Sequence, residues 1–278
     1  MAARRRLRGR ITAAALRSAR AFARHRRGRV AFCVATGPHH LRGLHLTATY
    51  RSASVVKAML LVADLRLAHR QRRGLTGRER SLLPPMIRVS DNNAALAVYS
   101  IVGKGGLFSL GRAAGMRQLA IPALFATQIS PADQSRFMRR LPKLIPHGFR
   151  GYALHLLSTI VPAQSWGVPR GLRPRGFRVS FKGGWVSGLV NQVALVRYGH
   201  ERVGVAIFTD HDPSMAYGER TIEGIAARLF RSIRKRLPKR HRPSRSEELQ
   251  LHPRRPKHRT PGGRRREQQL HSRTSPGA

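Results

Sequence analysis

The placement of the strand-like runs constrains the fold of this chain more than any other feature. Two runs rich in β-branched and aromatic residues occur early, and three more follow only after a long interval. The runs lie at Arg29–Val34, near Leu44–Thr49, around Phe177–Phe181, at Leu189–Val196 and around Val203–Ile207. Because two strands alone are barely stable, the early and late groups must meet in one sheet. The sequence therefore predicts an α+β fold, with an antiparallel sheet of about five strands and an inserted all-helical lobe.

Amphipathic helices are expected to flank this sheet at both ends of the chain. The N-terminal stretch has apolar residues at spacings of three and four, and a late stretch repeats the pattern. The two apolar faces are Leu7, Ile11, Ala15, Ala19 and Phe22, and Ile222, Ile225, Leu229 and Ile233. The other faces of the first helix are rich in arginine, so it suits either an anionic membrane surface or the sheet. We favour packing on the sheet.

Helix signals also mark the interval between the two groups of strands. Helical periodicity runs from about Val55 to Ala68. Ser130 followed by Pro131 and Asp133 is typical of a helix N-terminus. Leu83-Pro84-Pro85 reads as a turn before the next helix.

Composition divides the chain into a folded body and two basic ends. With 41% hydrophobic residues among 278, the chain has enough apolar side chains for a core. We expect a basic leader at 1–9, a folded domain at 10–237 with its helical lobe at about 58–170, and a disordered tail at 238–278. No uninterrupted apolar run approaches the roughly 18–20 residues that span a bilayer, so we expect no transmembrane segment. Arg17 and Arg20 interrupt the first apolar run, which leaves no convincing signal peptide.

The net charge of +42 raises the question of nucleic-acid binding. Aromatic residues are only 6% of the chain, whereas single-strand binding needs basic residues interleaved with stacking aromatics. We favour the general use of arginine at solvated positions, with nonspecific polyanion contact as a consequence and no specific nucleic-acid partner. Binding of a polyanion through the basic termini stays open as an alternative.

Metal and thiol chemistry have little support in the sequence. Cys33 is the single cysteine, so no intramolecular disulfide and no CxxC motif are possible, and it is expected to be a small buried side chain. His39-His40 lies in a Gly/Pro turn with no third ligand at a useful spacing, which indicates a surface loop. We expect no metal site and no cofactor. Trp166 and Trp185 suit either a substrate cleft or the core.

Three short motifs carry the possible chemistry. In Ser54-Val55-Val56-Lys57, positions i and i+3 of a helix share a face, so the lysine amine can reach the serine hydroxyl. Ser90-Asp91-Asn92 opens a later helix, and Lys182-Gly183-Gly184 closes a strand. Alone, each has an ordinary structural interpretation, such as a helix cap or a strand end.

Together, in this order, the motifs resemble the SxxK, SDN and KTG set of class A β-lactamases and penicillin-binding proteins. The resemblance covers roughly residues 10–236 and implies a cofactor-free serine hydrolase. By position, Ser54 would be the acylated nucleophile and Lys57 its base, and Ser90 would relay a proton to the leaving group. Lys182 would supply electrostatic stabilisation. The remaining roles that the resemblance implies are substrate binding by Asn92, Gly183, Gly184 and Trp185, and an oxyanion hole from the backbone amides of Ser54 and Trp185.

Two departures from the family pattern affect the expected activity. Gly183 stands where the family usually has a hydroxyl residue that helps bind a substrate carboxylate. Between Glu79 and Glu201 there is no glutamate, and the only aspartates are Asp91 and Asp133. Class A β-lactamases use a loop glutamate to activate the deacylating water, and the corresponding stretch, 116–128, has no acid.

We therefore expect a serine acyl hydrolase that acts on an amide or ester, such as a β-lactam or a cell-wall peptide, with weak β-lactam turnover. The alternative from another class is a catalytically silent, penicillin-binding-like module. The resemblance implies a place at the cell envelope, outside the cytoplasm, although the sequence shows no convincing signal peptide.

Overall fold

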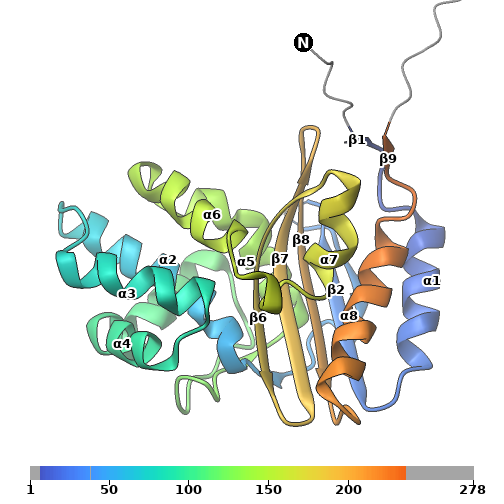
Figure 1. The fold of residues 1–278 in the computed structure, drawn as a ribbon, viewed down its shortest axis with the longest axis horizontal. Coiled ribbons are helices and arrows are strands. Elements are labelled where there is room, and N and C mark those ends of the chain that lie inside the picture. The colour runs from blue at the N-terminus through green and yellow to red at the C-terminus, as the bar shows by residue number, and fades with distance from the viewer. Residues whose placement is uncertain (1–6, 38, 236–278) are drawn as a thin grey trace, which may run out of the picture. The chain divides into compact units, whose positions relative to one another are not determined.

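The structure, a computed structural model, describes residues 7–37 and 39–235 of the chain. Its main sheet has five antiparallel strands in the order β3-β2-β8-β7-β6 (Figure 1). Their bounds are Leu41–Leu44 (β3), Arg29–Ala35 (β2), Glu201–Asp210 (β8), Leu189–Tyr198 (β7) and Arg178–Val186 (β6). The early strand β2 pairs with the late strand β8 over its full length, from Arg29 opposite Asp210 to Ala35 opposite Gly204. The predicted α+β architecture, with one sheet built from both parts of the chain, is confirmed.

Helices cover both faces of this sheet. On one side α1 (Ala13–Arg24) packs beside α8 (Met215–Leu229), and the short α7 (Val168–Leu172) contacts α8 (Figure 1). On the other side α5 (Pro131–Leu144) contacts β2, β7 and β8. Gly204 on β8 allows this close approach, because a Cβ there would collide with the backbone of α5 at Ser135 and Arg139. The expectation that the first helix packs on the sheet rather than standing free agrees with its buried residues, which include Ala15 and Ala19.

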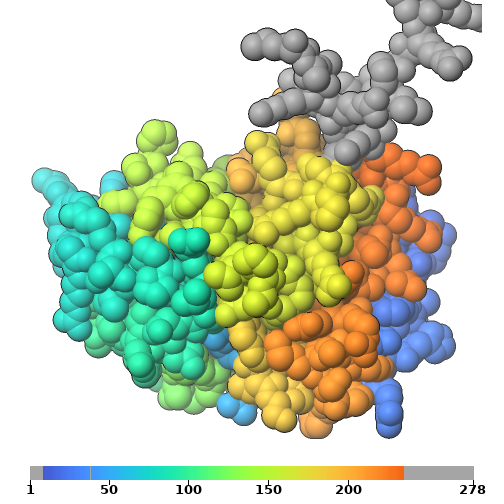
Figure 2. Space-filling model, viewed as in Figure 1, coloured from blue at the N-terminus to red at the C-terminus, as the bar shows by residue number. Residues whose placement is uncertain are grey.

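The remaining helices form the lobe at the left of Figure 1. They are α2 (Val56–Arg70), α3 (Gly77–Arg88), α4 (Asn92–Ala114) and α6 (Arg150–Ser158). Every side chain of α2 from Val56 to Leu65 is buried, so α2 is the central helix of this lobe. Figure 2 shows the lobe, in cyan and green, in contact with the yellow and orange elements of the sheet side.

Within the described part of the chain, α4 is the one helix long and apolar enough to cross a membrane by length and composition. Its best window has a mean hydropathy of 1.3, and 39% of that window is buried. Gly103 interrupts the helix with a φ of 67° and a ψ of 171°. The two helical segments on either side are each shorter than the roughly 20 residues that a bilayer requires. Length and composition therefore overestimate the continuous helical segment of α4 that could cross a bilayer.

Two element boundaries differ from those expected from sequence. The first helix begins at Ala13 rather than near Leu7, because the Thr12 side chain accepts a hydrogen bond from the Ala15 amide and caps the helix. Residues Leu7–Arg8 (β1) instead pair with Arg234–Lys235 (β9). The second strand ends at Leu44 rather than continuing to Thr49, because His45 adopts a left-handed conformation with a φ of 50°.

The expected turn at Leu83-Pro84-Pro85 is wrong, because both prolines lie inside α3. Thr76 and Glu79 form a capping box that starts this helix. Leu83, Met86 and Ile87, around the prolines, are completely buried. The burial of these apolar side chains therefore maintains α3 through the two prolines, which disfavour a helix. The late helix also ends before Ile233, although Ile233 is itself fully buried.

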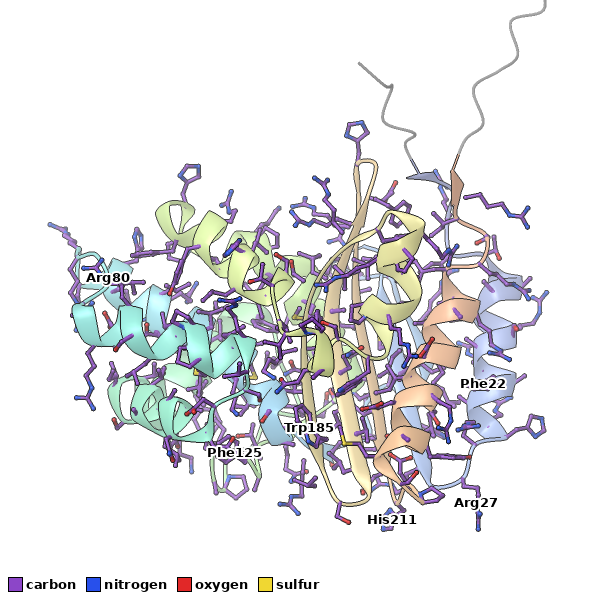
Figure 3. All side chains as sticks on the ribbon, in the orientation of Figure 1. Phe22, Arg27, Arg80, Phe125, Trp185 and His211 are labelled. Atoms are coloured by element: carbon purple, nitrogen blue, oxygen red, sulfur yellow. The ribbon has the colours of Figure 1, made fainter. Side chains whose placement is uncertain are left out.

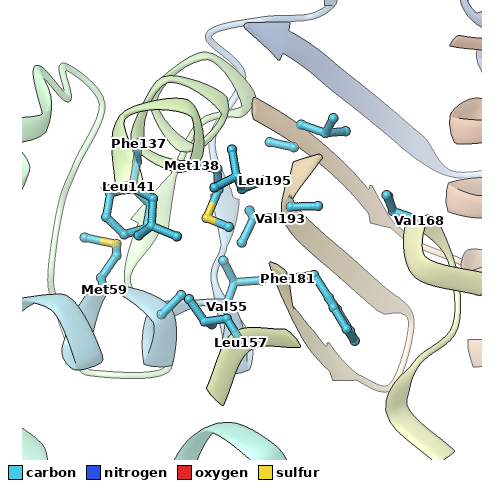
Figure 4. Close-up of a cluster of buried hydrophobic side chains, with 14 of the residues drawn as sticks. Val55, Met59, Phe137, Met138, Leu141, Leu157, Val168, Phe181, Val193 and Leu195 are labelled. Carbon is cyan, nitrogen blue, oxygen red and sulfur yellow. The ribbon is translucent and has the colours of Figure 1, made fainter. Parts of the chain in front are cut away.

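The core joins the lobe to the sheet. Figure 4 shows Met59 of α2 and Phe137 and Leu141 of α5 in one cluster with Phe181 and Val193 of the sheet. The 3₁₀ helix η1 (Ala53–Val55) contacts β6 and leads into α2. Short elements complete the fold: β4 (Tyr50–Arg51), β5 (Gln128–Ile129), η2 (His147–Phe149), η3 (Pro162–Gln164) and η4 (Arg173–Arg175). The expected tail at 238–278 and most of the leader at 1–9 lie outside the described residues.

Candidate active site

Ser54 lies at the junction of the lobe and the sheet, in η1 directly before α2. Backbone hydrogen bonds fix the segment before it, from the Ser52 amide to the Thr127 carbonyl (2.8 Å) and from the Ala53 amide to the Phe125 carbonyl (3.2 Å). Ala53 has a φ of 43°, a conformation that non-glycine residues rarely adopt. The surrounding structure therefore holds a strained backbone immediately before the predicted nucleophile.

Gly184 on β6 lies against the backbone of this segment. A Cβ at Gly184 would sit 2.7 Å from the carbonyl oxygen of Ser52 and from the amide nitrogens of Ser54 and Val55. Only glycine fits at such a distance. The requirement for glycine at this position therefore comes from the approach of β6 to Ser54, and it brings the neighbouring Trp185 close to Ser54.

Lys57 lies in the first turn of α2, with its side chain buried against the start of α4. Its Nζ donates to Asn92 Oδ1 (2.7 Å), to the Ser90 carbonyl oxygen (2.5 Å) and to Ser90 Oγ (3.1 Å). Ser90 itself has a φ of 61°. Two of the three predicted motifs, SxxK and SDN, therefore converge at the ammonium of Lys57.

Lys182 extends from β6 to the same point. Its Nζ lies 3.0 Å from Ser90 Oγ and also donates to the Gly183 carbonyl oxygen at 2.8 Å. The hydroxyl oxygen of Ser90 thus accepts hydrogen bonds from two lysines. Because a hydroxyl has two lone pairs and one proton, this arrangement leaves the Ser90 O–H available to donate.

Burial lowers the pKa of both lysines. Burial reduces the pKa of Lys57 to about 8, and the nearby Asp91 acts in the opposite direction. The pKa of Lys182 lies well below its usual value because its ammonium is fully buried and because Lys57 carries a like charge. Both lysines therefore lose a proton more readily than a free lysine does, and the neutral amine is the form that can accept a proton.

The Ser54 hydroxyl is half-buried and has no hydrogen-bond partner among residues 7–37 and 39–235. The Lys57 amine is directed to Ser90 and Asn92 rather than to Ser54. Catalytic hydrogen bonds often shorten only when substrate binds. The structure thus brings Lys57, Ser90, Asn92 and Lys182 into one network, with Ser54 beside it.

Trp166 occupies the space next to Gly183, a contact that the motif analysis did not anticipate. A Cβ at Gly183 would lie 2.8 Å from Cζ2 and 2.9 Å from Cη2 of the indole. Gln192 of β7 fixes this segment, donating to the Trp166 carbonyl and accepting from the Val168 amide. Trp166 is 5% exposed and contacts Trp185 edge to face, with ring centroids 6.0 Å apart. The glycine in the sequence signals that another group fills the place of the usual hydroxyl side chain.

An aromatic ring, rather than a carboxylate, lies over Lys57 from the loop between α4 and α5. Lys57 Nζ is 5.2 Å from the centroid of Phe125, and Figure 3 shows Phe125 and Trp185 at the same edge of the molecule. The two aspartates nearby in sequence have other partners. Asp91 caps α4 by accepting from the Ala94 amide, and Asp133 accepts from the Arg117 and Gln118 amides and from Arg136.

The cysteine and the histidine pair considered from the sequence lie in environments that indicate no chemistry. Cys33 is fully buried on β2, and burial raises the pKa of its thiol to about 11. His39 and His40 are exposed. Within residues 7–37 and 39–235 there is no group of three His, Cys, Asp or Glu side chains that could hold a metal ion.

Comparisons with known proteins agree with this fold. The chain is similar to a β-lactamase from Sphaerobacter thermophilus DSM 20745, with 20% identity and a TM-score of 0.70 over 80% of this chain and 97% of that one. It is also similar to PBP-A, with 15% identity and a TM-score of 0.68 over 78% of this chain and 94% of that one. A class A β-lactamase representative from Bacteroides cellulosilyticus DSM 14838 has 13% identity and a TM-score of 0.71, over 81% of this chain and 99% of that one. At these identities the likeness shows the fold alone. A search of curated protein sequences gave no match.

The sequence itself also matches the model of a protein family. The model of the Beta-lactamase enzyme family matches residues 68–233, which include Ser90, Asn92 and Lys182 and begin after Ser54 and Lys57. The match covers more than half of the chain, and the fold of the described residues agrees with it. The chain belongs to the β-lactamase enzyme family.

Proposed function

We propose that the protein is a serine acyl hydrolase that forms an acyl-enzyme on Ser54, with an amide or ester such as a β-lactam or a cell-wall peptide as substrate. The observation that carries this proposal is the position of Ser90 Oγ between the ammonium groups of Lys57 and Lys182, at 3.1 and 3.0 Å. A purely structural core would gain nothing from two buried lysine amines around one hydroxyl, because burying such polar groups is costly.

In the proposed acylation, Ser54 Oγ attacks the substrate carbonyl and a new C–O bond forms. Neutral Lys57 accepts the Ser54 proton, and the backbone amides of Ser54 and Trp185 stabilise the oxyanion. The C–N or C–O bond of the substrate then breaks. Ser90 gives its proton to the leaving group and regains one from Lys57. Lys182 keeps the Ser90 hydroxyl oriented by hydrogen bonding to its oxygen.

Deacylation of a β-lactam is proposed to be slow. The leaving amine of an opened β-lactam stays tethered in the site, so the attacking water needs a base of its own. Phe125 lies over Lys57, and neither Asp91 nor Asp133 is free to serve, since both are engaged in capping or in the α4–α5 loop. Losing a positioned general base typically costs about 10²–10⁴-fold in rate. Simple activated esters are expected to turn over, since their leaving group departs and Lys57 can then activate water.

Labelling with a fluorophosphonate tests the proposal. The intact protein should gain one phosphonyl adduct by mass spectrometry, located on the peptide that contains Ser54, and Ser54→Ala should gain none. Ser81→Ala is the matched control, because Ser81 is exposed on α3 and lies in none of the three motifs, so labelling should be unchanged. Absence of an adduct from the folded native protein would favour the catalytically silent alternative.

A further inference from the structure

A second concave region of the molecule is lined almost entirely by cations. It is a hollow of about 840 Å³ formed by the end of α4, the start of the α4–α5 loop, α5 and the start of β8. We name it the arginine groove, after Arg112, Arg117, Arg136, Arg139, Arg140 and Arg202. Lys143 adds a seventh cation. His39, from the loop between β2 and β3, completes the lining together with Gly115 and Met116, which is its one apolar side chain.

The arginine groove lies at the opposite end of the sheet from the candidate active site. Arg202 is at the start of β8, next to the turn that connects β7 to β8. Trp185 and the turn that follows it are at the other end of the same strands, where β6 passes into β7. Any function of the groove is therefore structurally separable from chemistry at Ser54.

The cations of the groove are poorly compensated by the described residues. Arg136 is the one member with a carboxylate within 4.0 Å among them, at 3.0 Å from Asp133, and it also donates to the Gly115 carbonyl. Asp133 is itself 2% exposed and is further engaged by the Arg117 and Gln118 amides. Among the described residues, one ion pair within 4.0 Å thus serves seven cations, and their mutual repulsion raises the free energy of the free protein.

Arg139 is the most constrained member. Its backbone is held against Gly204 of β8 by the close packing of α5 on the sheet. Its Nε is completely buried and has no hydrogen-bond partner within the described part of the chain. Burial and the neighbouring charge of Arg202 both lower its pKa, while Glu201 acts in the opposite direction. Close packing of α5 on β8 therefore restricts Arg139, which lines the groove while its Nε stays buried.

We propose that the arginine groove binds a compact anion with several negative charges on linked phosphate groups, such as a di- or triphosphate. Guanidinium groups match phosphate oxygens with paired hydrogen bonds, and several of them are required to neutralise a polyphosphate. A single small anion would leave most of the groove uncompensated. Nucleic acid fits less well, because His39 is the one aromatic side chain in the lining, whereas binding of successive bases needs a series of stacking rings.

Titration calorimetry with inorganic tripolyphosphate tests this proposal on the full-length protein at about 0.15 M salt, where weak surface interactions are largely screened. One site per chain is expected. The double variant Arg112→Gln with Arg202→Gln should weaken the affinity by at least about tenfold, which corresponds to about 1.4 kcal/mol. Both residues are exposed, so the variant should fold. Arg139→Gln should weaken binding to a similar extent.

The matched control is Arg78→Gln with Arg80→Gln, which removes the same charge from exposed positions on α3. It should bind tripolyphosphate within about twofold of the native protein, since distant surface charges are screened. Equal loss in the two double variants would overturn the proposal, because it would show attraction to net charge rather than to a site. Fluorophosphonate labelling of Ser54 should be unchanged in all of these variants.

Two further arms distinguish the source of the phosphate groups. Tripolyphosphate should displace a single-stranded oligonucleotide completely, and an oligonucleotide that binds the groove more tightly and resists displacement would overturn the proposal in favour of nucleic acid. Vesicles with phosphatidic acid should bind through the groove if the phosphate is a lipid headgroup, with loss in Arg112→Gln/Arg202→Gln. Binding of free tripolyphosphate without vesicle binding identifies a soluble ligand, and absence of both refutes the site.

Discussion

Asp64 provides a test of the structure at a place unrelated to the candidate active site. It lies in the middle of α2 with no exposure to solvent, and neither carboxyl oxygen has a hydrogen-bond partner within residues 7–37 and 39–235. Burial, and then the negative charge of Glu79, raise the pKa of Asp64 to about 7, and Arg73 acts in the opposite direction. Burial and Asp64 also raise the pKa of the neighbouring Tyr152. Glu79 stays ionised, because Arg73 and Thr76 hold its pKa at about 2.

The raised pKa of Asp64 makes the free energy of unfolding depend on pH with a definite sign. Below about pH 4 the carboxyl is protonated in both states and contributes nothing. As pH rises from about 4 to 7, the unfolded chain loses this proton while the folded protein keeps it. Stability therefore falls by about 1.4 kcal/mol per pH unit, to a total of about 4 kcal/mol, and stays constant above the folded pKa.

Asp64→Asn removes this titration while preserving the shape of the side chain. Urea unfolding of both proteins at pH 5 and at pH 8 measures the effect. The stability of the variant relative to the native protein should rise by about 2–3 kcal/mol between these two values of pH. Because other titrating groups are common to both proteins, they cancel in the comparison.

Glu201→Gln is the control for removing an acid, because Glu201 is exposed at the start of β8. Its stability relative to the native protein should change by less than about 0.5 kcal/mol over the same range, as is usual for a surface substitution. A relative stability of Asp64→Asn that is equally independent of pH would refute the argument. It would mean that Asp64 is ionised and compensated in the folded protein.

Three further predictions concern the site itself. The rate of fluorophosphonate labelling should rise about tenfold between pH 7 and pH 9, because Lys57 acts as base in its neutral form and its pKa is about 8; a flat profile would contradict this role. Gly184→Ala should slow labelling at least about tenfold, since its Cβ would lie 2.7 Å from backbone atoms, whereas Gly77→Ala, in open space, should not. Gly183→Thr and Trp166→Ala should each be destabilising, and the double variant should lose less stability than the sum of the two, because the indole occupies the space that the threonine needs; additive stabilities in urea unfolding would refute the clash.

Short-range patterns in the sequence were sufficient to predict the sheet, whereas the convergence of the motifs was implied by their resemblance to the β-lactamase and penicillin-binding-protein set. The early and late strands are separately recognisable, and the instability of a two-stranded sheet requires them to pair. Lys57, Ser90 and Lys182 each belong to a short motif, and the structure places all three within one hydrogen-bond network. The order of the three motifs, through its resemblance to the family, therefore indicated that Lys57, Ser90 and Lys182 lie close together.

Features that depend on distant packing were not predictable in this way. Trp166 and Phe125 belong to no motif, and only the folded chain places them beside Gly183 and Lys57. The run with Pro84 reads locally as a turn but is helical, because its apolar neighbours are buried in the lobe. At position 183 the sequence indicated only that glycine replaces the hydroxyl residue usual in the family, and the structure places the Trp166 indole beside it.

Mass spectrometry of the intact protein during incubation with penicillin tests the central claim most directly. A single penicilloyl adduct on Ser54 should form and persist over many minutes, because the proposed roles of Lys57, Ser90 and the backbone amides support acylation, whereas Asp91 and Asp133 are engaged elsewhere and cannot support deacylation. Ser54→Ala should remain unmodified under the same conditions. An adduct that also forms in Ser54→Ala, or rapid hydrolysis of the antibiotic by the native protein without a detectable adduct, would contradict the central claim.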